Sequence, residues 1–209
     1  MPQISIEGNE CLKVIYQIKL VGLVLNSDLN WTDHVDYTIG RVNKILWQIT
    51  RFRQLGASRE KLMMLYVLKV RSVLMFGAVA LHSSLTQELS NRLELQQKKA
   101  LKIILGSQYR SYSNALQLTQ LPRLYTLRSE ACLRWSLKAQ LNSKHADMFT
   151  LNQSTANTRY TKKFKEYYRH TAKYYKSAIP SMTRSLNEYF DSQISSTPER
   201  TFCNTTMQQ

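Results

Sequence analysis

The sequence predicts a mainly α-helical protein: a helical bundle preceded by a short β-hairpin or strand pair and followed by an irregular basic C-terminal extension. Three observations predict this fold. Apolar side chains alternate near the N-terminus, they recur at helical spacing from Thr32 to Leu137, and the pattern weakens after Asn142. A chain of 209 residues suits one domain, or one domain with an appendage.

The strand prediction rests on residues 12–25, which are rich in Val, Ile and Leu. Every second side chain from Val14 to Leu20 falls on the same face, as is typical of one or two β-strands. Gly22 interrupts this stretch and indicates a bulge or a close backbone approach. The sequence Asn-Ser-Asp at 26–28 indicates a turn. The alternating residues are Val14, Tyr16, Ile18 and Leu20.

The first predicted helix begins near Thr32 and ends at Gly56, because one apolar face recurs along it. That face consists of Val35, Ile39, Val42, Leu46 and Ile49. A second helix over 59–80, which Ser58 can cap, is apolar on several sides and is therefore predicted to be the central, buried one.

A third predicted helix begins after Thr86, a good N-cap residue, and ends at Gly106. A short helix follows Ser113, and Leu121-Pro122 begins another, since proline is tolerated in a first turn. The inward side chains of that last helix are Leu124, Leu127, Ala131, Trp135 and Leu137, whereas Arg128 is expected on its polar face.

The chain is therefore predicted to have four parts. A strand segment (1–28) leads into a helical domain (29–142), which is followed by a basic, tyrosine-rich extension (143–190) and a polar tail (191–209) that we expect to be disordered. Within the extension, 150–158 is rich in Thr, Asn, Ser and Gln, which is typical of a linker.

The charge is strongly positive and unevenly distributed. The chain has 29 Lys and Arg against 14 Asp and Glu, a net charge of +15. Residues 41–144 contain eighteen of these bases and four of the acids, so this region alone has a net charge of +14. Because acids are too rare to neutralise the helix faces, we expect RNA or DNA as the partner. A surface that only keeps the protein in solution is the alternative.

The candidate nucleic-acid-binding residues lie on the polar helix faces and in the segment 159–189, where bases alternate with tyrosines. Tyrosines there can stack on unpaired bases beside phosphate-binding cations, or they can pack the segment onto the helices. The candidates are Arg41, Lys44, Arg51, Arg53, Lys98, Lys99, Lys102, Arg110, Arg159, Lys162, Lys163, Lys165 and Arg169.

No motif for catalysis is present in the sequence. It contains no phosphate-binding loop, no H-E-x-x-H, no G-x-S-x-G and no [YF]-x-D-D, the last being the paired carboxylates that hold metal ions in polymerases. Asp33 and Asp36 are instead expected to complement the dipole in the first turn of the first helix. We therefore expect no catalytic residue, no metal site and no cofactor in this chain.

The cysteines and the apolar runs favour an intracellular protein, nuclear or cytoplasmic. Cys11, Cys132 and Cys203 are odd in number and far apart, which indicates neither a disulfide framework nor a zinc site. No uninterrupted apolar run approaches the roughly 20 residues that span a bilayer, so we expect no membrane partner.

Several stretches, taken in order, resemble the reverse transcriptases of non-LTR retrotransposons of the LINE type, jockey-like elements among them. They are LVGLVLNSDLNWTDHV (20–35), VRSVLMFGAVALHSSLT (70–86), LELQQKKALKIILG (93–106), YSNALQLTQLPRLYTLR (112–128), NTRYTKKFK (157–165) and AIPSMTRSLNEY (178–189). The resemblance covers about residues 14–190. Val21, Phe76 and Leu81 depart from the family pattern, which has Leu, Tyr and Trp there.

The resemblance implies the thumb and downstream part of an RNA-directed DNA polymerase, without the fingers and the catalytic palm. The helical domain would then hold a template–primer duplex by its backbone, and Mg²⁺ would belong to the missing palm. The fingers and palm are a further expected partner, and the chain alone is expected to be inactive. The alternatives are a structural or interaction protein, or the remnant of a degenerate element with no retained function.

Overall fold

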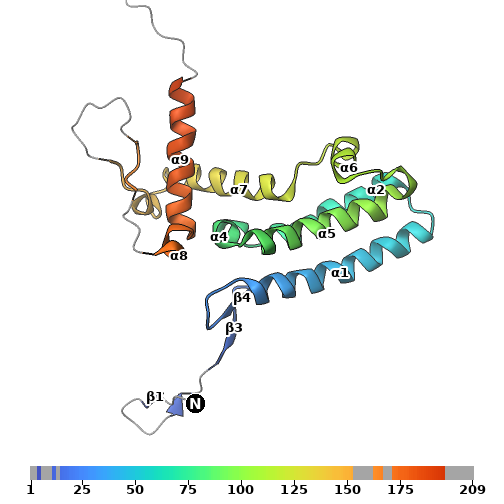
Figure 1. The fold of residues 1–209 in the computed structure, drawn as a ribbon, viewed down its shortest axis with the longest axis horizontal. Coiled ribbons are helices and arrows are strands. Elements are labelled where there is room, and N and C mark those ends of the chain that lie inside the picture. The colour runs from blue at the N-terminus through green and yellow to red at the C-terminus, as the bar shows by residue number, and fades with distance from the viewer. Residues whose placement is uncertain (1–3, 6–10, 13–14, 153–161, 167–170, 196–209) are drawn as a thin grey trace, which may run out of the picture. The chain divides into compact units, whose positions relative to one another are not determined.

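The structure, a computed structural model, describes residues 4–5, 11–12, 15–152, 162–166 and 171–195. It divides into two compact units, Met1–Cys132 and Leu133–Gln209, with the boundary inside helix α7 (Leu124–Ala139). Helices dominate both units, and short antiparallel strand pairs lie near the N-terminus (Figure 1). The predicted mainly α-helical fold class is therefore confirmed, whereas the four-part division stays a prediction.

The predicted strands form a hairpin. Strand β3 (Gln17–Leu20) pairs with β4 (Leu23–Asn26), and a separate antiparallel pair joins β1 (Ile4–Ser5) to β2 (Cys11–Leu12). Val21 and Gly22 form the two-residue turn of the hairpin, with φ of +49° and +85°. A Cβ on Gly22 would lie only 2.9 Å from the ring of Phe76. Gly22 therefore marks a turn and a close approach, and not a bulge.

Helices α1 (Thr32–Gln54) and α5 (Gln87–Leu105) lie side by side (Figure 1). Asp36 forms an ion pair with Arg92 near their N-terminal ends, and Arg53 bonds to Ile103 near their C-terminal ends, so the two helices run parallel. The Thr86 side chain accepts a hydrogen bond from the amide of Leu89, which confirms the predicted cap of α5.

The predicted central helix is not continuous, which corrects the expectation for 59–80. It is built from α2 (Arg59–Leu65), a π-helical segment (Tyr66–Arg71) and α3 (Ser72–Met75), and the chain then breaks before α4 (Ala78–Leu81). The break lies at Gly77, whose φ of +68° is left-handed and whose missing Cβ makes room for Leu23 of the hairpin. Ser58 stands at the N-cap position of α2 without a capping hydrogen bond from its side chain.

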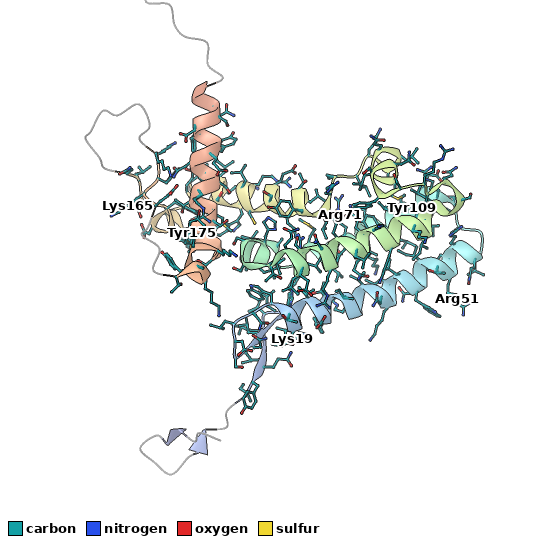
Figure 2. All side chains as sticks on the ribbon, in the orientation of Figure 1. Lys19, Arg51, Arg71, Tyr109, Lys165 and Tyr175 are labelled. Carbon is teal, nitrogen blue, oxygen red and sulfur yellow. The ribbon has the colours of Figure 1, made fainter. Side chains whose placement is uncertain are left out.

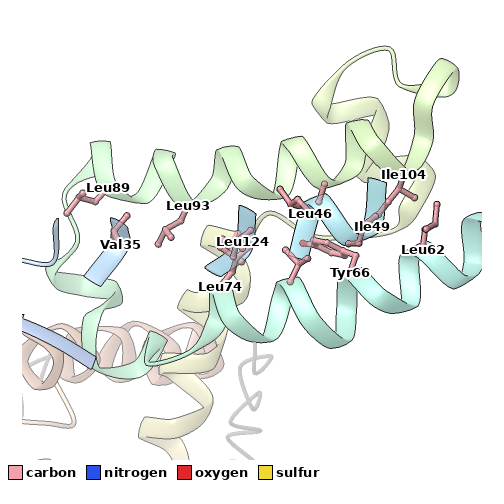
Figure 3. Close-up of a cluster of buried hydrophobic side chains, with 13 residues drawn as sticks. Val35, Leu46, Ile49, Leu62, Tyr66, Leu74, Leu89, Leu93, Ile104 and Leu124 are labelled. Atoms are coloured by element: carbon pink, nitrogen blue, oxygen red, sulfur yellow. The ribbon is translucent and has the colours of Figure 1, made fainter. Parts of the chain in front are cut away.

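Apolar side chains from α1, the broken central helix, α5 and the start of α7 form the core of the first unit (Figure 3). Within it, the Tyr66 hydroxyl donates to Gln97 Oε1 at 2.8 Å, and Gln97 Nε2 donates to the carbonyl of Pro122 at 2.9 Å. The short helix α6 (Tyr112–Thr119) is capped by Ser111, and α7 begins at Leu124, just after the predicted start at Leu121-Pro122. The buried cluster is Val35, Val42, Leu46, Ile49, Leu62, Tyr66, Val70, Leu74, Leu89, Leu93, Ala100, Ile104 and Leu124.

The second unit contains helices α8 (Ala172–Tyr175) and α9 (Ala178–Ser195). A row of ring contacts joins Trp135, Phe149, Phe164 and Phe190. The buried Asn187 side chain accepts from the amide of Phe164 and donates to its carbonyl, at 2.9 and 3.1 Å. The weak apolar pattern after Asn142 did not predict a helix as long as α9, which extends into the predicted polar tail. The rest of that tail lies outside the described residues.

Within the described part of the chain, one helical stretch, Arg59–Ser84, is long and apolar enough to cross a membrane by length and composition. Core helices pass the same test, and here Leu62, Tyr66, Val70 and Leu74 are buried in the core of the first unit. The nuclear or cytoplasmic location stays a prediction.

Candidate nucleic-acid interface

An open hollow of about 550 Å³ lies between the C-terminal parts of α1 and α5. Three of the predicted nucleic-acid-binding residues line it, namely Arg53 from α1 and Lys99 and Lys102 from α5. Leu46, Ile103 and Gly106 form the rest of the lining. Because the two helices run parallel, cations separated by about fifty positions in the sequence converge on one site.

Arg53 is held in this hollow by the end of α5. Its Nη1 donates to the carbonyl of Ile103 at 2.8 Å, one of the last carbonyls of the helix, which lack intrahelical partners. A Cβ on Gly106 would collide with the Arg53 guanidinium, and Gly106 has a φ of +55°. Gly106 therefore ends the helix and also leaves room for the cation that lines the hollow.

The lysines beside Arg53 have no side-chain partner among the residues that the structure describes. Among the described residues, Lys98, Lys99 and Lys102 are exposed and take part in no hydrogen bond or ion pair of their side chains. Lys98 lies one turn before Lys102 on α5 and does not line the hollow. Helix dipoles account for part of this placement, since cations are favourable at helix C-termini, where Arg51, Arg53 and Lys102 lie.

Three acids of the same unit, Glu94, Asp33 and Asp36, make contacts outside the hollow. Glu94 accepts hydrogen bonds from the Tyr112 hydroxyl and from the amides of Leu124 and Tyr125, so it caps the start of α7. Asp33 lies in the first turn of α1, as predicted, and accepts from Asn26. Asp36 lies beyond that turn and forms an ion pair with Arg92, which corrects its predicted role. The positive charge of the hollow therefore stays available to a ligand.

Three further candidates lie on the outer face of α1 together with two exposed aromatic side chains. We call Tyr37, Arg41, Lys44, Trp47 and Arg51 the α1 stripe. The Arg51 guanidinium lies 5.3 Å from the Trp47 ring centroid, and that of Arg41 lies 5.9 Å from the Tyr37 ring. Figure 2 shows Arg51 near the end of α1 that lies away from the hairpin residue Lys19.

Lys19 extends the stripe at its N-terminal end. Its Nζ donates to the Tyr37 hydroxyl at 2.8 Å and lies 4.6 Å from the ring centroid. This hydrogen bond, together with the charges of Lys19 and Arg41, lowers the pKa of Tyr37. The sequence patterns did not single out Tyr37 and Trp47 as site residues. Their position outside the predicted apolar face of the helix was the signal that could have found them.

None of the other described candidates lines the hollow. Arg110 is exposed beyond α5. In the second unit, Lys162 pairs with Glu166 at 2.9 Å, and Lys163 lies 3.6 Å from the Phe190 ring centroid. Lys165 is exposed, whereas Arg159 and Arg169 lie outside the described residues.

Two described tyrosines of the second unit, Tyr175 and Tyr189, pack within it. The Arg184 guanidinium lies 3.7 Å from the Tyr175 ring centroid, and Tyr189 contacts Phe190. Tyr174 is exposed. Of the two alternatives left open for this segment, the contacts support the structural one for Tyr175 and Tyr189.

Arg128 is buried, which corrects its expected place on a polar face. Its Nη2 donates to Ser90 Oγ at 3.0 Å, while Nε and Nη1 have no protein partner. Burial, with a smaller contribution from the charge of Arg128, lowers the pKa of His82 to about 4. Burial also raises the pKa of the Cys132 thiol, to about 11.

Within the described residues, no group of three or more His, Cys, Asp and Glu side chains is placed to hold a metal ion. Comparisons of the chain with protein-family models, with curated proteins and with solved structures return no match.

Proposed function

We propose that this chain is a non-catalytic part of a retrotransposon RNA-directed DNA polymerase and that its first unit holds template–primer nucleic acid by the phosphates. The hollow that brings Arg53, Lys99 and Lys102 together is the observation that carries the proposal. The ordered resemblance to LINE-type reverse transcriptases supports it.

The chemistry of the hollow suits a phosphate backbone. The planar guanidinium of Arg53 can donate two parallel hydrogen bonds to phosphate oxygens, and the flexible ammonium groups of Lys99 and Lys102 act as point charges. Contacts of this kind fix the position of a duplex without reading its sequence. We therefore expect affinity without marked sequence preference.

Two lysine pairs of equal charge test the proposal. The double variant Lys99→Gln, Lys102→Gln is expected to weaken binding of a template–primer duplex about five- to thirtyfold, the loss of two charged contacts. The control, Lys61→Gln with Lys69→Gln, removes two exposed lysines that do not line the hollow and is expected to change affinity less than about twofold.

Fluorescence anisotropy at one fixed salt concentration measures both variants. Equal losses in the two variants would show that net charge alone attracts the duplex. Unchanged affinity in the first variant would exclude the hollow as the binding site.

A structural or interaction protein, whose cations serve an acidic protein partner, is the second candidate. The intramolecular contacts of Lys162, Lys163 and Arg184 favour a structural role for the second unit, because these cations already have partners within it. Recovery of the same protein partner after nuclease treatment would favour this candidate over the first.

A further inference from the structure

The α1 stripe presents a flat aromatic surface to solvent among cations. Trp47 is 62% exposed, and the stripe cations next to it are Lys44 and Arg51. At about 100° per residue, the five stripe positions fall within about one third of the helix circumference. This face lies opposite Val42, Leu46 and Ile49, which are buried in the core.

Contacts with the backbone of a duplex do not require exposed aromatic side chains. Bases in a duplex are already stacked on one another, and phosphate contacts need donors and cations only. Unpaired bases differ, because every base has a ring face that an aromatic side chain can cover. An exposed tryptophan between cations is therefore the combination that holds a single strand.

The dimensions of the stripe fit a short single strand. Tyr37 and Trp47 are ten positions apart on α1, which is about 15 Å along the axis at 1.5 Å per residue. At about 3.4 Å per phosphate, the rise of one strand in a stacked helix, this distance matches at most four to five nucleotides of a single strand. Cations lie along the whole distance, from Lys19 beside Tyr37 to Arg51 beside Trp47.

We propose that the α1 stripe binds single-stranded nucleic acid, with Trp47 stacking on an unpaired base and Arg41, Lys44 and Arg51 contacting the phosphates around it. The inference rests on the proposed function, which it deepens: the hollow holds the duplex, and the stripe holds an unpaired part of a strand.

A single-residue series in the full chain tests this inference. Trp47→Ala is expected to weaken binding of an oligothymidylate of about twelve nucleotides about five- to hundredfold, the effect of losing one stacked base. Trp47→Phe retains a ring and should lose less. Met64→Ala is the matched control, because Met64 is 61% exposed on α2, and it should leave affinity unchanged.

Two further probes separate bases from charge. An abasic sugar–phosphate strand of the same length and charge should bind Trp47→Ala and the unchanged protein equally, because it has nothing to stack. Polyglutamate, which stands for an acidic protein, should likewise show no dependence on Trp47. Circular dichroism establishes that each variant is folded.

Each outcome decides the inference. It stands if Trp47→Ala weakens oligothymidylate binding and spares the abasic strand. It is overturned if Trp47→Ala weakens binding of the abasic strand or of polyglutamate as much as binding of oligothymidylate. It is also overturned if Trp47→Ala leaves the affinity for oligothymidylate unchanged, or if the unchanged protein fails to bind oligothymidylate. If the inference fails but duplex binding is still weakened by Lys99→Gln with Lys102→Gln, the proposed function stands. If that double variant does not weaken duplex binding, the proposed function fails as well.

Discussion

At the scale of single residues, Gly106 and Arg53 occupy neighbouring space at the end of α5. Gly106→Ala should lower the free energy of unfolding by about 1–2 kcal/mol, because φ is +55° and the new Cβ displaces the guanidinium of Arg53. Gly40→Ala is the control, since nothing lies within 4 Å of its Cβ, and alanine inside α1 should add about 0.5–1 kcal/mol. Urea unfolding measures both; equal effects would contradict the assigned role of Gly106.

His82, which is partly buried, gives a pH-dependent contribution to stability. The pKa of His82 is lowered to about 4 in the folded protein, so only the unfolded chain takes up its proton between pH 6.5 and 4. The contribution of His82 is therefore complete above pH 6.5 and is lost as the pH falls toward 4. Denaturant unfolding at pH 7.5 and 5.0 should show a smaller acid-induced loss in His82→Gln than in the unchanged protein. Identical losses would contradict this assignment.

At the scale of elements, Glu94 links α5 to the start of α7 and to Tyr112 of α6. Glu94→Gln removes the charge that the amides of Leu124 and Tyr125 and the Tyr112 hydroxyl share, and it should cost about 1–3 kcal/mol of unfolding free energy. Glu88→Gln, which neutralises an exposed carboxylate in the first turn of α5, should cost about 0.3–1 kcal/mol. Thermal or urea unfolding compares the two; a larger loss in Glu88→Gln would contradict the account.

The sequence predicted those elements whose signals are local. The apolar repeat of α1 and the Thr86 cap of α5 are set by residues within a few turns of one another, and both are confirmed. The break at Gly77 was missed because its cause is Leu23, which is distant in sequence. The length of α9 was missed because its buried Asn187 binds Phe164, which lies in a separate segment of the chain. No apolar repeat within α9 alone predicts such a contact.

Only part of the candidate site could be predicted, because sequence periodicity does not report contacts between distant segments. Periodicity placed the exposed cations of α1 and α5 on polar faces, but it cannot say that parallel helices bring Arg53 to Lys99 and Lys102. It also placed Arg128 on a polar face, whereas the structure buries this side chain against Ser90.

At the scale of the whole molecule, residues 1–209 are expected to supply positive charge and not catalysis. The proposed function places the metal-binding aspartates in a palm outside residues 1–209, and these residues contain no [YF]-x-D-D. Incubation with template–primer, nucleotides and Mg²⁺ should therefore give no primer extension. Extension by the purified chain would contradict the proposal, and the same assay with a complete reverse transcriptase provides the control.

Binding of a template–primer duplex across a salt series tests the central claim most directly. If phosphates occupy the hollow, the logarithm of the association constant should fall linearly with the logarithm of salt concentration, at about 0.9 per phosphate neutralised. The double variant Lys99→Gln, Lys102→Gln should reduce that slope by about 1.8, the contribution of two contacts. An affinity that does not fall with salt, or a slope that the variant leaves unchanged, would contradict the account.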